Sequence, residues 1–214
     1  MRTTIITAIY DNYDDLKPIL PQVGEVDWVC VTDAPIESPG GWRVVVEPRP
    51  GQHPNVAAKR PKMLPWEYTH AHQSIWVDAS FQITSPTFAL EAMQVARPIA
   101  QFSHPWRDCV YEEAEASLAL PKYQGLPIER QMAHHRAHQH PQHWGLWATG
   151  VIARIHAPNV VALGESWLRE CQEWSFQDQL SQAPHLRLLG LRPDELTGSH
   201  LKNPWLSYQG SSRH

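Results

Sequence analysis

Three short apolar runs of this chain each end at an aspartate, and this pattern constrains the fold more than any other feature. The runs and their acids are Thr4–Tyr10 with Asp11, Val26–Thr32 with Asp33, and Ile75–Val77 with Asp78. Short apolar, largely β-branched runs bounded by turn-forming residues are typical of buried strands. In open α/β sheets, such strands bring ligand-binding groups to their carboxyl edge. The sequence therefore predicts an α/β protein with a central mixed, mostly parallel sheet flanked by helices.

The segments between and after these runs supply the other expected elements. Further strands are predicted at Gly41–Val46, Ile99–Phe102 and Trp147–Ile155. Asp11–Asp15 is predicted to be a turn that caps a short helix through Leu16. Further helices are predicted at Val56–His72, with an interruption near Pro61 or Pro65, and at Phe88–Ala96, Tyr111–Leu120, Glu129–His140 and Ser166–Ser181. No linker is long enough to divide the chain. We expect one domain over residues 1–185 and a loop-rich segment over residues 186–214.

Composition supports a globular domain and excludes several classes of protein. The 214 residues are 42% hydrophobic, which is enough for a sizeable buried core. The 19 prolines against 11 glycines favour many short elements over a long helical bundle. The net charge of −4 gives no general attraction to nucleic acid or to an anionic membrane.

Cysteine usage and hydropathy predict a cytoplasmic protein without a membrane partner. Cys30, Cys109 and Cys171 are odd in number and widely separated, so they provide neither a disulfide framework nor a thiolate zinc site. The first apolar stretch is too short and too polar for a signal peptide. No run approaches the roughly 20 apolar residues that span a bilayer.

Asp78 is the first candidate for chemistry. A carboxylate at the end of a buried strand is costly unless it is paired or binds a cation. The plainer alternative is an aspartate that caps the following turn at Ser80 or Thr84.

The sequence IWVDAS around Asp78 resembles the acidic strand-end motif of nucleotide-sugar glycosyltransferases of the GT-A fold. The wider pattern is similar to the TOD/MUCI-type glycosyltransferase-like family. The matching stretches follow one another in the family's order: TAIYDNYDDL (7–16), VCVTDAP (29–35), AKRPKMLPW (58–66), SIWVDASFQI (74–83), FSHPWRDCVYEEA (102–114) and FQDQLS (176–181). The resemblance implies a single GT-A-like, Rossmann-like domain that binds a nucleotide sugar.

The resemblance also implies which residues bind the donor. Those expected near the nucleobase or the ribose are Thr7, Ala8, Tyr10 and Asp33. Lys59 and Lys62 are implied on the diphosphate side, where a departing nucleoside diphosphate needs cations. A solvated helix face is the alternative for these lysines.

The family resemblance raises the question of a metal ion, because Ser80 stands where the general motif has a second acid. Asp78 would then share Mn²⁺ or Mg²⁺ with a residue from elsewhere. SHLKNPW (199–205) resembles a shortened C-terminal segment of glycogenin-type retaining transferases, which implies His200 as the metal ligand and Lys202 on the diphosphate. We expect this segment to close over the donor site. The alternative is a surface loop.

Asp178 is expected on the acceptor side, at a helix start or turn, because Asp178-Gln179 resembles the Asp-Gln pair of such transferases. It would deprotonate the acceptor hydroxyl if the reaction inverts, or position the acceptor if the reaction retains. Arg107 is a further candidate for contact with a phosphate or a sugar acid. Salt-bridged scaffold is the alternative for the polar group around Arg107.

The run HHRAHQHPQH offers His134 and His138 at a spacing that can bind a metal from one helical turn. It lacks the glutamate of a metalloprotease motif, so an acceptor-binding helix is preferred over a metallohydrolase. The expected function is sugar transfer from a nucleotide sugar to a hydroxyl of a glycan or small molecule. Transfer to hydroxymethylated pyrimidine in phage-type DNA is the alternative acceptor chemistry. A non-catalytic nucleotide- or glycan-binding module is the alternative of another class.

Overall fold

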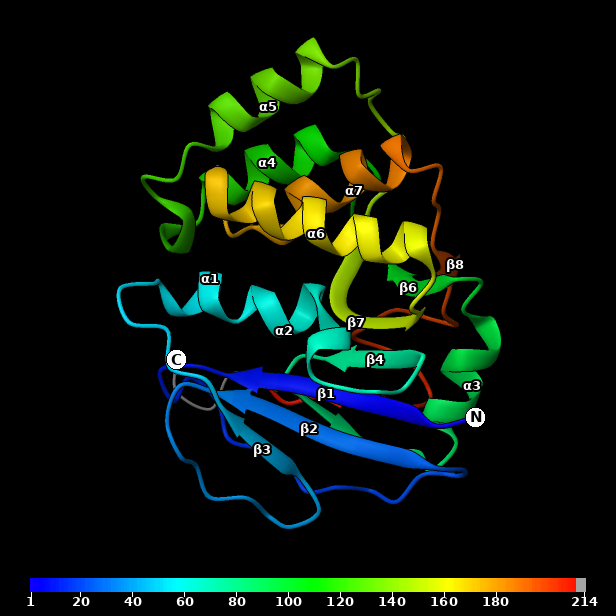
Figure 1. Ribbon diagram of the computed structural model, residues 1–214. Coiled ribbons are helices and arrows are strands. Elements are labelled where there is room, and N and C mark those ends of the chain that lie inside the picture. The colour runs from blue at the N-terminus through cyan, green and yellow to red at the C-terminus, as the bar shows by residue number, and fades with distance from the viewer. Residues whose placement is uncertain (211–214) are drawn as a thin grey trace.

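A seven-stranded sheet forms the centre of the computed structural model, which describes residues 1–210 (Figure 1). Its order is β3-β2-β1-β4-β7-β6-β8. The strands of this sheet are β1 (Thr3–Ile9), β2 (Val26–Thr32), β3 (Arg43–Val46), β4 (Gln73–Val77), β6 (Ile99–Ser103), β7 (Trp147–Ile155) and β8 (Asp194–Glu195). A second, two-stranded sheet pairs β5 (Phe81–Ile83) with β9 (Leu206–Tyr208). The predicted α/β class and mixed sheet are confirmed.

Strands β1 to β4 run parallel, whereas β7 runs antiparallel between β4 and β6. The carboxyl ends of β1, β2 and β4 therefore share one edge with the middle of β7. The ladder continues past Val77, because the backbone N–H of Asp78 donates to the carbonyl of Gly150 over 2.8 Å. Asp78 is thereby fixed at this edge.

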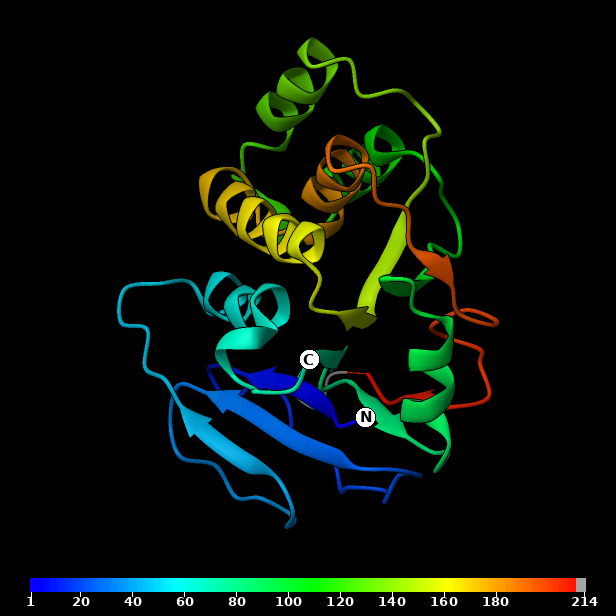
Figure 2. The ribbon, with the colours of Figure 1, turned by 45° about the vertical axis from the view of Figure 1, so that its right-hand side comes forward.

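Helices cover both faces of the sheet. They are α1 (Pro54–Ala57), α2 (Lys59–Met63), α3 (Phe88–Val95), α4 (Val110–Leu118), α5 (Ile128–Ala137), α6 (Pro158–Glu173) and α7 (Asp178–Leu188), with short 3-10 helices η1 (Pro65–Glu67) and η2 (Pro121–Tyr123). Figures 1 and 2 show α4 to α7 gathered at one side of the molecule, with α1 and α2 between them and β1. None of the helices within residues 1–210 is long and apolar enough to cross a membrane.

The core follows the two-residue alternation of the strands. Ile6 and Trp76 face the α2, α6 and α7 side, where they pack with residues such as Trp167. Ile5 and Ile75 face the opposite side, where α3 and the β5-β9 pair cover them. A third cluster lies among α4, α5 and η2. The sheet is thus buried on both faces, as its β-branched composition requires.

The turn predicted after β1 is present at Asp11 and Asn12, but the short helix predicted through Leu16 is wrong. Asp11 and Asn12 adopt left-handed backbone angles, with φ of 56° and 52°, and this conformation cannot begin a right-handed helix. The N–H of Asp11 donates to the carboxylate of Asp33 over 2.9 Å, which holds the turn against the end of β2. A tertiary contact therefore overrides the local helix signal.

The predicted helix Ser166–Ser181 is wrong in its boundaries, because two helices share this region. α6 begins eight residues earlier in the chain, at Pro158, and ends at Glu173, and α7 begins at Asp178. Ser175 leaves the helix to donate to Gln131 over 2.7 Å, and the ring of Phe176 stacks on that of His53. These long-range contacts stabilise an interruption between the two helices that the spacing of apolar residues alone does not indicate.

Two smaller boundaries also differ from the prediction. The predicted helix Val56–His72 is interrupted before Pro65, as expected, whereas Pro61 lies in the first turn of α2, where proline is tolerated. The segment predicted to be loop-rich from residue 186 still contains the end of α7, and it adds strands β8 and β9.

Candidate functional site

Two lysines and an aspartate form a buried ionic cluster at the sheet edge. The ammonium Nζ atoms of Lys59 and Lys62 each lie 2.7 Å from Oδ2 of Asp178. Thr149, at the start of β7, donates its hydroxyl to Oδ1 of the same carboxylate over 2.7 Å. The Asp178 side chain is only 5% exposed and that of Lys62 only 4%. Both carboxylate oxygens are therefore occupied by donors shielded from water.

The electrostatics of this cluster favour its charged form. Burial by itself would raise the pKa of Asp178, but the charges and hydrogen bonds of Lys59 and Lys62 outweigh burial and hold it well below its usual range. Burial would likewise lower the pKa of Lys59, yet Asp178 raises it above its ordinary value. Such a carboxylate is a poor proton acceptor at neutral pH, which argues against Asp178 as the general base predicted for an inverting reaction.

Helix α2 brings both lysines to Asp178 because they lie three positions apart on one helical face. The guanidinium of Arg154, buried in β7, donates to the carbonyl of Lys62 at the end of α2. α6 lies so close to α2 that a Cβ at Gly164 would lie 2.2 Å from the carbonyl oxygen of Met63. α2 is thus held from two directions, although five residues make no stable helix alone.

Asp78 lies beside the lysine cluster. Its Oδ1 accepts from the indole N–H of Trp76 over 2.6 Å and lies 3.6 Å from the ammonium of Lys62. The side chain is 39% exposed, so its carboxylate reaches solvent. A Cβ at Gly150 would lie 3.2 Å from Oδ2 of Asp78 and 2.9 Å from the ring of Phe81, so this position needs glycine. The strand-end acid is therefore both oriented and accessible.

Two cavities meet at this cluster. The β1 cavity, of about 490 Å³, lies over the carboxyl end of β1 and is lined by Ala8, Tyr10 and Asn55, among others. The β7 cavity, of about 580 Å³, lies over the start of β7 and is lined by Thr149, Gly150 and Gln179, among others. The residues that line both are Lys59, Lys62, Asp78, Ser80, Lys122 and Tyr208. The ionic cluster thus sits at the junction of two ligand-sized spaces.

The four residues predicted near the nucleobase and ribose do not all lie in the same cavity. Ala8 and Tyr10 line the β1 cavity. Thr7 is buried and faces a small pocket on the other side of the sheet edge. Asp33 lines a neighbouring hollow, which shares Asp14 with the β1 cavity. The structure therefore brings Ala8 and Tyr10 to the lysine cluster, but not Thr7 and Asp33.

Arg107 lines the β7 cavity and forms an ion pair with Glu113. Its Nε donates to Oε2 of Glu113 over 2.6 Å, and His104 lies 3.5 Å from the same oxygen. Burial first, and the charge of Arg107 second, lower the pKa of His104 to about 4. The alternative of salt-bridged scaffold describes this arrangement well, although Arg107 still reaches the cavity.

The C-terminal segment reaches the site through His200 but not through Lys202. His200 lines the β7 cavity, and its ring lies edge-on to those of Phe81 and Trp106. Burial lowers the pKa of His200, and the charge of Asp78 opposes this only in part. Lys202 is exposed, pairs through its backbone with Ser199 and lines neither cavity.

The histidine run is divided among different environments. The Nδ1 atom of His138 contacts the carbonyl of His134 in its own helix, over 2.9 Å. His135 is buried 2.9 Å from Glu170, and His140 is buried against Tyr111. The ring centroids of His134 and His138 lie 4.2 Å apart, but neither residue lines a cavity at the lysine cluster.

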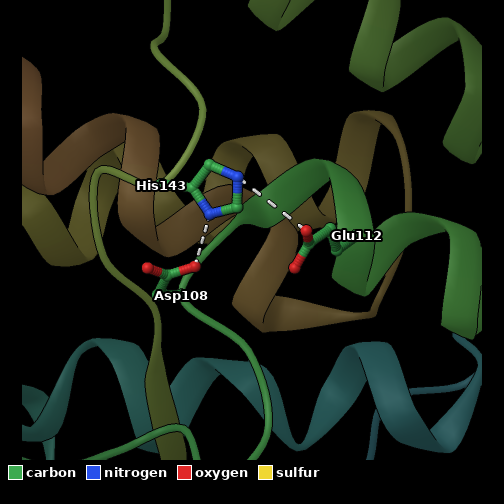
Figure 3. A group of neighbouring side chains, drawn as sticks. All are labelled: Asp108, Glu112 and His143. Atoms are coloured by element: carbon green, nitrogen blue, oxygen red, sulfur yellow. Dashed lines mark hydrogen bonds and ion pairs between the residues drawn. The ribbon is translucent and has the colours of Figure 1, made fainter.

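His143 joins Asp108 and Glu112 in the one trio within residues 1–210 whose carboxylate and imidazole atoms lie within 4.8 Å of one another (Figure 3). Its Nδ1 lies 2.6 Å from Asp108 and its Nε2 lies 3.9 Å from Glu112. All three side chains are exposed, and none lines either cavity at the lysine cluster. The trio is an open surface network.

Besides Tyr208, which lines both cavities, sequence reasoning missed two polar residues at the junction. Lys122, in η2, lines both cavities, and its pKa is lowered by burial first and by repulsion from Lys59 second. Thr149 supplies the second contact to Asp178. Neither stands in a motif, because each is brought to the cluster only by the packing of distant segments.

Comparison with protein families places most of the chain in one family. No curated protein matches the chain. A family model for the TOD1/MUCI70 glycosyltransferase-like domain matches residues 29–194, which include α2, Asp78 and Asp178. Most of the chain, with the whole lysine cluster, therefore lies inside the match. The protein belongs to the TOD1/MUCI70 glycosyltransferase-like family.

Proposed function

We propose that the protein transfers a sugar from a nucleotide sugar to an acceptor hydroxyl at the junction of the two cavities. One observation carries this proposal: the buried Lys62 and the half-buried Lys59, both held by Asp178, lie beside the accessible carboxylate of Asp78 where the cavities meet. A departing nucleoside diphosphate is a strong anion, and preorganised cations in a shielded site stabilise it far better than water does. Membership of a glycosyltransferase-like family supports the same reaction class.

The β1 cavity is the proposed donor side. It lies outside the carboxyl ends of parallel strands, where open α/β sheets bind nucleotides. Tyr10 and Ala8 would contact the nucleoside, and Lys59 and Lys62 would contact the diphosphate. The β7 cavity would then hold the acceptor on the other side of the cluster.

Asp178 is proposed as the residue that positions the lysines. Its two oxygens fix Lys59, Lys62 and Thr149 before any ligand arrives, so little reorganisation is needed when negative charge develops on the leaving group. Lys122 adds a third cation at the same junction. These lysines hold the diphosphate oxygens, and Asp178 holds the lysines.

Mn²⁺ or Mg²⁺ remains a proposal, with Asp78 and His200 as its protein ligands. His200 Nδ1 is a buried nitrogen with no hydrogen-bond partner among the described residues, and His200 lines the same cavity as Asp78. One carboxylate and one imidazole fit a cation that takes its other ligands from phosphate and water. When bound, the cation would neutralise diphosphate charge as a Lewis acid.

The test is a panel of nucleoside diphosphates and nucleotide sugars, with Mn²⁺ or with EDTA, read by thermal shift and by donor consumption. We expect one nucleoside diphosphate to raise the melting temperature of the wild type, since a ligand of the native state stabilises it. Lys62→Met should remove this shift. Arg60→Met is the matched control, because Arg60 lies on the same helix but pairs with Glu67 at 2.6 Å, away from the junction.

The outcomes separate the candidate functions. A thermal shift together with consumption of the nucleotide sugar supports the transferase. A shift without any consumption, in the presence of sugar and hydroxyl acceptors, supports the non-catalytic binding module. Equal shifts in Lys62→Met and the wild type would remove the diphosphate role of the lysines. Loss of activity in EDTA and in His200→Ala, with the Arg60→Met control active, supports the cation.

A further inference from the structure

The mouth of the β7 cavity carries exposed apolar side chains that the proposed chemistry does not use. They are Trp106, Leu120, Leu201 and Tyr208, each at least 45% exposed, and they come from three separate segments of the chain. Of the ten tryptophans, all of which lie within the described residues, only Trp106 is exposed, with 67% of its surface open. Large apolar side chains gathered around a cavity mark a binding surface rather than a core.

Trp106 is presented by a braced turn. Pro105 precedes it and restricts the backbone. The N–H of Arg107 donates to Nδ1 of His104 over 3.1 Å, and the N–H of His104 donates to the carbonyl of Leu146 over 2.9 Å. The indole is therefore held at the rim before any ligand binds, which reduces the entropy lost on stacking.

The groups beneath this rim suit a neutral ligand rich in hydroxyls. The side chains of His104, Gln177 and Gln179 line the cavity beneath this rim and carry groups that exchange hydrogen bonds with hydroxyls. The charge of Arg107 is paired with Glu113. A DNA backbone would instead need cations along the rim, where these four side chains are apolar or phenolic.

We propose that the rim around Trp106 is a carbohydrate subsite, in which the apolar C–H face of a pyranose ring stacks on the indole. The acceptor of the transfer proposed above is then a glycan, a step that rests on that proposed function. Leu120 and Leu201 flank the stacked ring, and the polar side chains deeper in the cavity receive its hydroxyls. A glycan acceptor places one hydroxyl toward the lysine cluster while the rest of the sugar remains at the mouth.

Iodide quenching of tryptophan fluorescence tests the subsite without any need for catalysis, because Trp106 is the exposed indole. The probes are cellobiose, maltose and N,N′-diacetylchitobiose, with glycerol as a polyol that lacks a ring face and an oligonucleotide containing hydroxymethylcytosine as the rival ligand. We expect at least one disaccharide to reduce quenching in the wild type and in Leu188→Ala, an exposed apolar residue outside both cavities. Trp106→Leu should lose both the quenchable signal and the disaccharide effect.

Kinetics supply the second readout once a glycan acceptor is found. Trp106→Ala should raise the acceptor KM about tenfold, since a stacked aromatic contributes roughly that much, and should leave the donor KM unchanged. The subsite is overturned if no disaccharide protects the wild type, if glycerol protects equally, or if only the oligonucleotide protects. Protection by a disaccharide without sugar transfer would overturn the proposed function but not the subsite. Transfer to the oligonucleotide alone would overturn the subsite but not sugar transfer.

Discussion

Replacing Asp178 by asparagine tests the ionic cluster most directly, because it removes the charge and keeps the shape. At 2.7 Å and an effective dielectric constant of about 20, each of the two lysine contacts contributes an attraction of about 6 kcal/mol. Desolvation of the ions and relaxation of the variant offset part of this, and breaking a buried pair typically costs about 3–5 kcal/mol. We expect Asp178→Asn to lower the free energy of unfolding by that amount, measured by urea denaturation with circular dichroism at pH 7.

The matched control is Asp108→Asn. Asp108 also has a close partner, the imidazole of His143 at 2.6 Å, but its side chain is 64% exposed. Water screens an exposed pair of this kind, so this variant should unfold almost as the wild type does. If both variants lost the same small amount, the buried cluster would not have the strength that we assign to it.

The pH dependence gives a second check on the same variant. The folded pKa of Asp178 lies below its unfolded value of 3.8, so its contribution is fully present above that value and is lost as the pH falls toward the folded pKa. The stability difference between Asp178→Asn and the wild type should therefore be the same at pH 7 as at pH 5. A difference that disappeared over this interval would mean that another group, with a higher pKa, controls the effect.

Three further results are expected. Gly150→Ala should lower the free energy of unfolding by about 1–3 kcal/mol in urea denaturation and should impair donor consumption, because the added Cβ would displace Asp78. An unchanged denaturation curve would contradict the close packing at Gly150. Thr149→Val should lower the free energy of unfolding by about 1.5–3 kcal/mol, because it removes a hydrogen bond to the charged Asp178. An unchanged free energy of unfolding would contradict that hydrogen bond. The melting temperature should fall as the pH drops from 6.5 toward 4. Burial lowers the pKa of three histidines to about 4, so the unfolded chain binds more protons than the folded chain in this pH range. A melting temperature that did not change with pH would contradict the burial of these histidines. These histidines are His104, His140 and His156.

The sequence was most informative where chemistry and local pattern coincide. Apolar runs that end at an acid located β1, β2 and β4 correctly, and the strand Trp147–Ile155 matches β7 residue for residue. Asp78, Lys59 and Lys62 were predicted near one another, and the structure brings them together. Each of these predictions depends on residues close together in the chain or on a family motif.

The remaining features depend on contacts that no local pattern encodes. The interruption between α6 and α7 depends on Gln131 and His53, which lie far from it in sequence. Lys122 and Thr149 reach the cluster only after the whole domain has packed. The role of Asp178 follows from its burial with two ammonium groups, and burial of this kind cannot be deduced from an Asp-Gln pair.

The bracing of α2 has a consequence for how this family can diversify. Under the proposed function, the loop after β1 can exchange residues and so change which nucleoside is accepted, because it lines the β1 cavity without bracing α2. The two lysines on α2 cannot shift in the same way. Arg154 donates a hydrogen bond to the carbonyl of Lys62, and Gly164 of α6 packs so closely against the backbone of Met63 that α2 has no room to move. If donor choice and charge neutralisation are divided in the way proposed here, they lie in parts of the chain that can change separately, and a new donor should be sought by redesigning the loop after β1 while α2, β7 and α6 are kept.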